Sequence, residues 1–275
     1  MRVTISTLRE AKAQGRKFSA VSCYDYTSAK LVADAGVEVL LIGDSAAQFM
    51  LGFDSTLPVT MDFMAAITAA VKRAVPDRLI VADLPYESCQ AGVARIVKDS
   101  QRFIKECNAD IIKIEANEIK IETIKAIVDT GIAVMPHLGI RPQTLQYKAR
   151  GTTADDAAEL IKLADEMCQA GASMLLLEGT AREVAKIITK KLPIPVVSCG
   201  SGPDCDGQVL VLPDILNLAD GHKPKFSKSF ADIGKACIEA VALYDRQVKQ
   251  GLYPDDAHSY HMKAGEYEKL ERLMS

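Results

Sequence analysis

The chain has 275 residues, of which 48% are hydrophobic and 25% are charged, and its formal net charge is −3. This length suits one or two domains with a large core, including a single barrel of about 250 residues. The charge balance gives no indication of a nucleic-acid or membrane-surface partner. No apolar run approaches the ~18 residues of a membrane span, and the N-terminus lacks a signal-peptide core, so we expect a cytoplasmic protein.

The seven cysteines are scattered through apolar segments and include no Cys-x-x-Cys pair. Cys199 and Cys205 flank a glycine-rich turn, but their spacing is not that of a metal finger. An odd number of scattered cysteines is typical of reduced, mostly buried thiols in a cytosolic protein.

Short apolar runs alternate along the chain with longer segments of helical period. Several runs carry Val, Ile and Leu continuously, which is typical of strands buried on both faces of a parallel sheet. In chain order, the predicted strands are 19–24, 37–43, 78–84, 110–114, 132–137, 173–177, 194–199 and 208–212.

The segments between these runs have the period of helices, and Ala-Gly or Thr-Gly pairs repeatedly separate a helix from the next strand. This rhythm is typical of βα units. Thr60 precedes one helix as its N-cap, and Gly36 ends another as part of its C-cap. The predicted helices are 28–35, 61–75, 91–106, 118–128, 154–169 and 182–190.

About eight strands in this rhythm predict a closed α/β barrel, the (β/α)8 or TIM barrel, with a doubly wound open sheet as the alternative fold. No composition break divides the chain. We therefore predict a single catalytic domain over residues 1–262, followed by a charged helical tail at the surface over residues 263–275.

Polar side chains stand at or just past the ends of several predicted strands: Asp44, Asp83, Glu115, His137 and Glu178. In a barrel of parallel strands, the C-terminal ends of all strands open on the same face, where such enzymes carry their sites. We therefore expect these residues to converge at one mouth, although they lie far apart in the sequence.

Carboxylates crowded into a partly dry site repel one another unless a cation offsets them. Carboxylate oxygens without a cysteine or paired-histidine cluster favour a hard cation, and Mg2+ fits best. We predict Asp44 and Asp83 as direct metal ligands, with Glu115 close by and reaching the ion through a water. For each acid, the alternative is a helix cap or an ion pair with a lysine.

Lys113 lies two residues before Glu115, so the two side chains point to the same side of their strand. A lysine inside a barrel is costly unless it is paired. It would face the negative charge of a bound substrate, or form a structural ion pair with Glu115. Ser45 would bind a substrate carboxylate, or cap a helix or turn.

If the metal is held by Asp44 and Asp83, Glu178 is free to act as a base, because an apolar mouth raises the pKa of a carboxylate. Its alternative role is to cap the helix that begins near Ala181. His137 is a candidate catalytic residue or a structural histidine. The glycine-rich segment 198–208 would present backbone N–H groups to an anion, or form a packed turn.

Ordered sequence segments carry a resemblance to a known family. They are YDYTSAKLVADAGVEVLLIGDS from Tyr24, LGFDSTLPVTM from Leu51, IVADLPY from Ile80, IKIE from Ile112, HLGIRPQ from His137, LLLE from Leu175, GPDCDGQVLV from Gly202, and YPDDAHSY ending at Tyr260. Together they resemble the 3-methyl-2-oxobutanoate hydroxymethyltransferase family, also called ketopantoate hydroxymethyltransferase.

The resemblance implies a (β/α)8 barrel of the phosphoenolpyruvate mutase and isocitrate lyase superfamily. It also implies Mg2+, or another divalent cation, and 5,10-methylenetetrahydrofolate as co-substrate. The implied reaction transfers a hydroxymethyl group to 3-methyl-2-oxobutanoate and yields 2-dehydropantoate on the way to pantothenate and coenzyme A. Family members commonly assemble as decamers of two pentameric rings, so a homo-oligomer is expected.

The same resemblance assigns roles to the converging residues. Asp44 and Asp83 resemble metal ligands that also meet the substrate, and Glu115 resembles the acid that holds the metal through water. Ser45 and Lys113 resemble the oxoacid-binding pair. His137 resembles a site histidine and Glu178 the catalytic base.

Two segments at the mouth depart from the family pattern. GDSAAQ at 43–48 replaces the usual GDSLGM, and TLQYKARG at 144–151 is shorter than the family's segment. These departures leave two alternatives open. One is another Mg2+-dependent C–C lyase or transferase of 2-oxoacids in the same superfamily. The other is an inactive paralogue that binds a small molecule.

Overall fold

The structure is a computed structural model that describes residues 2–115, 121–144, 147–218 and 224–275. Eight parallel strands close into a barrel, in which each strand pairs with the next and β8 pairs with β1. The predicted barrel is therefore confirmed, and the open doubly wound sheet is wrong. The strands are β1 (Phe18–Ser22), β2 (Val39–Ile42), β3 (Leu79–Asp83), β4 (Ile111–Glu115), β5 (Val134–Gly139), β6 (Leu175–Glu178), β7 (Val196–Cys199) and β8 (Gly207–Val211).

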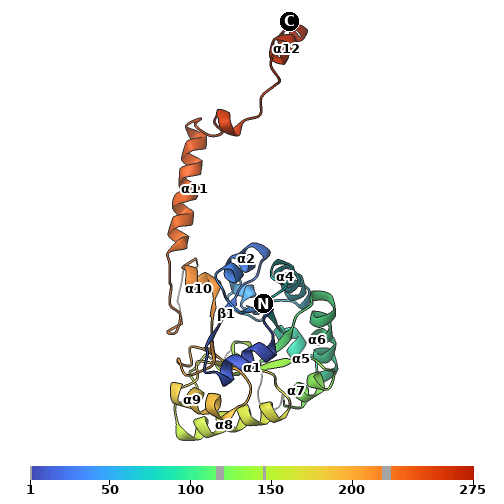
Figure 1. Cartoon of the computed structure of the whole chain (residues 1–275), viewed down its shortest axis with the longest axis vertical. Helices are drawn as coiled ribbons and strands as arrows, with labels where there is room; N and C mark the ends of the chain where they lie inside the picture. Colours follow the sequence, from blue (N-terminus) through green and yellow to red (C-terminus); the bar gives the residue numbers. More distant parts are fainter. Residues whose placement is uncertain (1, 116–120, 145–146, 219–223) are drawn as a thin grey trace.

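Helices surround the barrel (Figure 1). All six predicted helices are present, although the first residues predicted for the fourth, within 116–120, lie outside the described part of the chain. They are α2 (Tyr26–Asp34), α4 (Met61–Ala74), α6 (Val93–Cys107), α7 (Ile121–Val128), α8 (Ala154–Gln169) and α9 (Arg182–Lys191). The Thr60 side chain accepts from the N–H of Phe63 and so caps α4 as predicted. Gly36 follows α2 with a φ of 92°, the left-handed conformation that favours glycine at a helix end.

Several helices were not predicted from the sequence. They are α1 (Ile5–Ala13), α3 (Ala46–Phe49), α5 (Tyr86–Gln90), α10 (Leu212–Leu216) and α11 (Ile233–Lys249). The four-residue and five-residue helices α3, α5 and α10 are too short to show a helical period. At the C-terminus, α12 (Glu266–Met274) lies within the predicted helical tail.

The strands are buried on both faces, which explains their continuous apolar sequence. Leu40 and Ile42 of β2 pack outward in the core between strands and helices. Val39 and Leu41 of the same strand pack in a second core that fills the barrel, together with Leu8 of α1. This apolar filling makes the interior solid at the N-terminal end and leaves only the C-terminal mouth for polar side chains.

The C-terminal part of the chain leaves the barrel. From α11 onward it forms an arm, made of α11, the 3-10 turn Asp256–His258 and α12, that projects away from the strands (Figure 1). All residues of α11 and α12 are exposed or half-buried. The arm begins upstream of residue 262, and the domain boundary at that residue remains a prediction. In the described ranges, we find no helix with the length and apolar character that crossing a bilayer requires.

Candidate active site

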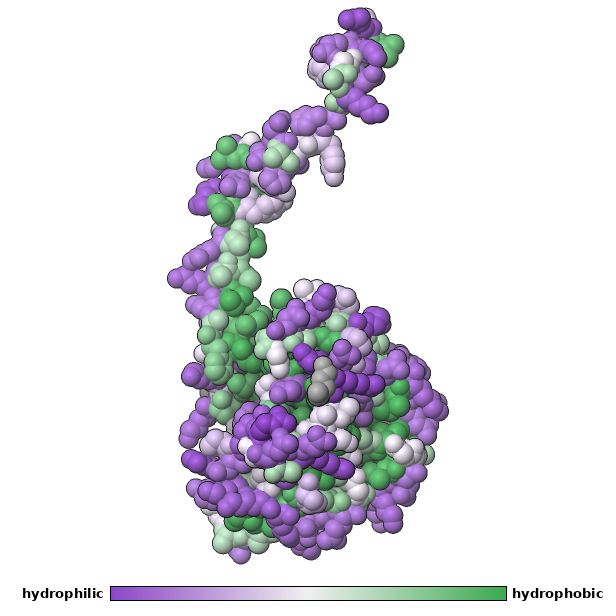
Figure 2. Space-filling model, in the orientation of Figure 1, coloured by the Kyte–Doolittle hydropathy of each residue, from purple (hydrophilic) through white to green (hydrophobic). Residues whose placement is uncertain are grey.

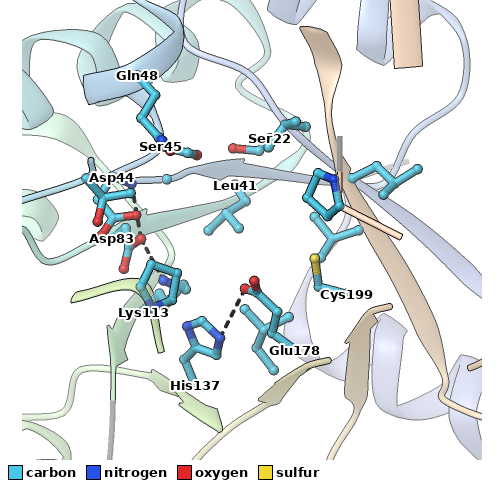
Figure 3. A pocket seen from close by; sticks show the side chains of 18 of the residues that line it. Ser22, Leu41, Asp44, Ser45, Gln48, Asp83, Lys113, His137, Glu178 and Cys199 are labelled. Atoms are coloured by element: carbon cyan, nitrogen blue, oxygen red, sulfur yellow. Dashed lines mark hydrogen bonds and ion pairs between the residues drawn. The ribbon is translucent and has the colours of Figure 1, made fainter. Parts of the chain in front are cut away.

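A cavity of about 460 Å³ opens at the C-terminal ends of the barrel strands. All seven residues singled out in the sequence line it: Asp44, Ser45, Asp83, Lys113, Glu115, His137 and Glu178. Asp44 and Ser45 lie two and three residues past the end of β2, and the others lie in β3 to β6. Figure 3 shows the labelled ones gathered around a common space. The structure therefore brings together residues that the chain separates widely.

A buried ion pair occupies one side of the cavity. Lys113 Nζ donates to Asp83 Oδ2 at 2.6 Å, and the backbone N–H of Asp44 donates to the same oxygen at 3.1 Å. The sequence left open an ion pair of Lys113 with Glu115, but the ion pair that forms is with Asp83. Lys113 and Asp83 are directly opposite each other in the β3–β4 ladder, which explains this choice.

The protonation equilibria of this pair reflect its burial. Burial raises the pKa of Asp83 above its usual value, against the lowering effect of Lys113. Burial by itself would lower the pKa of Lys113, but the nearby carboxylates of Asp83, Asp44 and Glu115 more than offset this and raise it. Lys113 is therefore a buried ammonium group at neutral pH.

In each of the carboxylates of Asp44, Asp83 and Glu115, one oxygen accepts a hydrogen bond from a protein donor. Asp44 Oδ2 accepts from Gln143 Nε2 at 2.9 Å, and Glu115 Oε2 accepts from the N–H of Gln143 at 2.9 Å. Asp83 Oδ1 and Glu115 Oε1 are buried and, among the described residues, have no hydrogen-bond partner. A buried carboxylate oxygen without a partner is costly, so this side of the cavity is short of positive charge or donors.

These oxygens fit a hard cation that is only partly coordinated by protein. Within residues 2–115, 121–144, 147–218 and 224–275, no three His, Cys, Asp or Glu side chains form a ready-made metal cluster. Mg2+ does not need one, because it is usually held by one or two carboxylates and completes its octahedron with water and substrate oxygens. Asp44 and Asp83, with Glu115 nearby, are a donor set of this kind.

The opposite side of the cavity carries Glu178. Its Oε2 atom lies 3.3 Å from Nε2 of His137, a contact drawn in Figure 3. His137 is 2% exposed, so the acid faces a buried ring. Among the residues described, no side chain caps the start of α9, so the role of helix cap left open for Glu178 is wrong.

The backbone places Glu178 through a close contact with the end of β5. The N–H of Ile140 donates to the carbonyl of Glu178 at 2.8 Å. Gly139 has a φ of 100°, and a Cβ atom there would lie 1.9 Å from that carbonyl oxygen. Only a residue without a side chain allows this approach.

Ser45 is positioned by a tyrosine. Its hydroxyl lies 2.9 Å from the Tyr24 hydroxyl and shares a hydrogen bond with it, while α3 begins without a cap from this side chain. Burial raises the pKa of Tyr24, so the phenol stays neutral. The capping role left open for Ser45 is therefore wrong, and its hydroxyl faces the cavity.

The glycine-rich segment after β7 forms the packed turn. The N–H of Ser201 donates to Ser198 Oγ, and Ser201 Oγ accepts from the N–H of Thr180. A Cβ at Gly202 would collide with the side chain of Arg182. These contacts support the turn that the sequence left as an alternative to an anion-binding loop.

Sequence reasoning missed several residues in and around the cavity. Tyr24 and Gln143 do not line it but bond to Ser45, Asp44 and Glu115, which do. Both are isolated polar residues whose partners lie elsewhere in the chain, so no local pattern marks them. Cys199 pairs with Glu178 in the β6–β7 ladder, and burial raises the pKa of its thiol well above the usual value. The lining also includes Phe49, Tyr147 and Phe226.

The two departing segments both reach the cavity. Ala46 and Ala47 of GDSAAQ are fully buried, and Gln48 lines the cavity wall. Tyr147 of the shorter 144–151 segment also lines it, whereas residues 145–146 lie outside the described part of the chain. Both departures therefore change walls of the cavity.

Comparison with known proteins finds one family along almost the whole chain. The family model described as ketopantoate hydroxymethyltransferase matches residues 2–256. The 3-methyl-2-oxobutanoate hydroxymethyltransferase of Koribacter versatilis is 41% identical over 278 residues, covering 100% of this chain and 94% of that protein. The enzyme of the same name from Nitrosopumilus maritimus is 41% identical, with 98% of both chains covered.

Solved structures share the barrel at much lower identity. The structure of 2,3-dimethylmalate lyase, a member of the PEP mutase/isocitrate lyase superfamily, has a TM-score of 0.60 and 17% identity, with both chains covered fully. Phosphonopyruvate hydrolase in complex with oxalate and Mg2+ has a TM-score of 0.61 and 16% identity, with 99% of this chain and 97% of that chain covered. These similarities show that the fold is shared.

The close approach of β5 to β6 at Gly139 predicts that adding a methyl group there destabilises the protein. Gly139→Ala would place Cβ against the Glu178 carbonyl and strain a left-handed backbone, so we expect both an overpacking cost of about 1–3 kcal/mol and a conformational cost of about 1–2 kcal/mol. Gly131→Ala is the matched control, because Gly131 has a φ of 82° with open space around it. Urea unfolding would measure both, and equal losses in the two variants would contradict the close approach.

Proposed function

The chain belongs to the ketopantoate hydroxymethyltransferase family, and we propose that it transfers a hydroxymethyl group from 5,10-methylenetetrahydrofolate to 3-methyl-2-oxobutanoate with Mg2+ or a similar divalent cation. The product would be 2-dehydropantoate. Family membership makes it an enzyme of one-carbon transfer in pantothenate biosynthesis. The metal, the folate donor and the residue roles are the part that we propose.

One observation carries the proposal. Buried carboxylate oxygens on Asp83 and Glu115, without partners among the described residues, lie beside a buried ammonium group. A further acid, Glu178, lines the same cavity. In this proposal, Asp44 and Asp83 hold the cation, with Glu115 close to it. A cation bound there would polarise the carbonyl of the oxoacid and offset negative charge on it. Phosphonopyruvate hydrolase, solved with Mg2+ and oxalate, offers a parallel, since oxalate and a 2-oxoacid each have two adjacent oxygens.

Glu178 is the base in this proposal. It takes the proton from C3 of 3-methyl-2-oxobutanoate, and the electron pair of that C–H bond becomes available for a new C–C bond. Contact with His137 orients the carboxylate. His137 is nearly fully buried beside it, so little water competes for this position.

Lys113 and Ser45 act on the oxygens of the substrate. The Lys113 ammonium group, already positioned by Asp83, lies where it balances negative charge that develops on oxygen as the proton leaves. Ser45 donates to the substrate carboxylate while Tyr24 holds its hydroxyl in place. Carbon C3 then bonds to the donor methylene carbon as one of the two C–N bonds of that carbon breaks. Water supplies the hydroxyl oxygen as the second C–N bond breaks. The two folate nitrogens take up the proton removed from C3 and one proton of the water, and tetrahydrofolate leaves.

The outer cavity provides space for the folate donor. A small oxoacid fills only part of about 460 Å³, a volume within the range of sites for drug-sized ligands. Phe49, Tyr147 and Phe226 line the cavity. Aromatic side chains of this kind suit the flat pterin ring of a folate, since ring stacking contributes beyond simple area burial.

We also propose that the chain works as a homo-oligomer, consistent with the decamer expected from the family resemblance, and that the arm contributes to assembly. Ile238 is 71% exposed and Val241 is 65% exposed, and Tyr244 and Val248 continue their stripe along α11. Figure 2 shows hydrophobic side chains along this arm. An exposed apolar stripe on a long helix is typical of a surface that another protein chain covers.

The barrel has a matching gap in its helical layer. Residues 200–206, all described, connect β7 directly to β8 without a helix, and the five-residue α10 follows β8. Two of the eight strands are therefore not followed by a barrel helix of ordinary length. We propose that the apolar stripe of a neighbouring copy's α11 covers this outer face.

The proposed chemistry predicts that the C3 proton of the oxoacid exchanges with solvent even in the absence of the folate donor. In deuterated water with Mg2+, we expect the enzyme to exchange the C3 proton of 3-methyl-2-oxobutanoate, followed by NMR, and to form 2-dehydropantoate once methylenetetrahydrofolate is added. Glu178→Gln should slow exchange at least about 100-fold, the lower range for a positioned base, while oxoacid binding persists. Glu183→Gln, an exposed acid on α9, is the matched control.

The outcomes of that experiment separate the candidate functions. Normal exchange by Glu178→Gln would show that Glu178 is not the base. Exchange by the unmodified enzyme without product would favour another oxoacid enzyme of the superfamily. Absence of exchange would favour a paralogue that only binds a small molecule.

The proposed role of the arm predicts a change in mass. Ile238→Asp with Val241→Asp should shift the protein to smaller species in analytical ultracentrifugation, because two charges would interrupt the apolar stripe. Glu239→Gln with Arg246→Gln changes two exposed polar residues of the same helix and serves as control. An unchanged mass in the aspartate variant would exclude the stripe as an assembly surface.

A further inference from the structure

Gln143 occupies an unusual position for a loop residue. It lies in the 3-10 turn Pro142–Thr144 that follows β5, yet it is 4% exposed. Its side-chain Nε2 donates to Asp44 Oδ2 and to the carbonyl of Leu84, both at 2.9 Å. Its backbone N–H donates to Glu115 Oε2, also at 2.9 Å. A single buried residue therefore bonds to residues at or just beyond the ends of β2, β3 and β4.

The partners determine how the amide is oriented. A carboxylate oxygen and a backbone carbonyl are both acceptors, so only the NH2 group of the amide can face them. Its two N–H bonds are used by these two acceptors. A glutamate at this position would set a carboxylate against two acceptors and add negative charge beside Asp44 and Glu115.

These bonds restrict the rotation of two carboxylates. An ionised carboxylate has two equivalent oxygens, and a donor on one of them selects which oxygen remains for another ligand. Gln143 holds Oδ2 of Asp44 and Oε2 of Glu115. The other oxygen of Glu115, Oε1, is buried and has no hydrogen-bond partner among the described residues.

We propose that Gln143 is the positioning residue of the cation site, because it turns one oxygen each of Asp44 and Glu115 toward the cation. This inference rests on the metal-dependent function proposed above. Gln143 does not touch the cation and acts through the two carboxylates. Donors that orient metal-binding side chains commonly change metal affinity by about 10–100-fold when they are removed.

Two substitutions test this role. Gln143→Met keeps the length and fills the space but donates nothing, and Gln143→Ala removes the side chain entirely. Both leave the backbone N–H to Glu115 in place and leave Asp44 Oδ2 and the Leu84 carbonyl without their donor. Gln169→Ala is the matched control, because Gln169 donates to the Asp165 carboxylate on the exposed surface of α8.

The probe is Mn2+, with its dissociation constant measured by electron paramagnetic resonance of the free ion. We expect Gln143→Met to raise this constant at least about 10-fold, with Gln169→Ala equal to the unmodified enzyme. Urea unfolding in EDTA should show one cooperative transition for each of the three proteins, with a lower midpoint for Gln143→Met because two buried acceptors lose their donor. The Mg2+ concentration for half-maximal activity should rise in parallel, while kcat at saturating Mg2+ changes much less.

The remaining outcomes are distinct. Unchanged Mn2+ affinity in Gln143→Met, beside clear binding by the unmodified enzyme, would overturn the role of Gln143 and leave the proposed function standing. No Mn2+ binding by the unmodified enzyme, with or without 3-methyl-2-oxobutanoate, would overturn both. Unfolding of both Gln143 variants in EDTA would assign this residue to the fold and also overturn the inference.

Discussion

The ion pair between Lys113 and Asp83 is the interaction on which the rest of the site depends. Three carboxylates, from Asp44, Asp83 and Glu115, lie close together in a mouth where each is less than a tenth exposed. Such a group tends to take up protons unless positive charge lies nearby. Lys113 supplies one buried charge directly on Asp83, but the unpartnered oxygens on Asp83 and Glu115 show that this compensation is incomplete. The remaining deficit is what makes a divalent cation plausible at this position.

The barrel makes this concentration of charge possible by separating it from the core. Apolar side chains from all eight strands fill the interior below the mouth, and α1 closes the opposite end. The ion pair therefore lies on a rigid apolar base, with hydrogen-bonded strand ends around it. Glu178 is carried by a different strand from Asp44, Asp83 and Glu115, and the positive φ of Gly139 lets the β5 end lie directly against its backbone. Acid and base functions can thus be held apart in one cavity.

The two segments set apart from the family pattern in the sequence, 43–48 and 144–151, both contribute residues to the walls of the cavity. Gln48 of GDSAAQ and Tyr147 of the shorter segment line the cavity, and the neighbouring Ala46 and Ala47 are fully buried behind it. The β6–β7 register places Cys199 beside Glu178, where burial keeps the thiol protonated. These neutral walls determine which molecules fit beside the oxoacid, whereas the charged residues determine what chemistry is available to them.

The sequence alone determined the eight strands, the barrel and the identity of the charged residues at its mouth. Strands buried on both faces must be continuously apolar, and parallel strands must end together, so local patterns carry this information. The alternation of strand and helix did not mark α11, because no strand follows it in the chain. In the described structure, none of the residues of α11 is buried. Which side chains bond to each other was decided only by the tertiary structure. The β3–β4 register pairs Lys113 with Asp83 although Glu115 is nearer in the chain, and Gln143 reaches three strand ends that lie up to 99 residues away. Such bonds depend on distances in space, which hydrophobic periodicity does not encode.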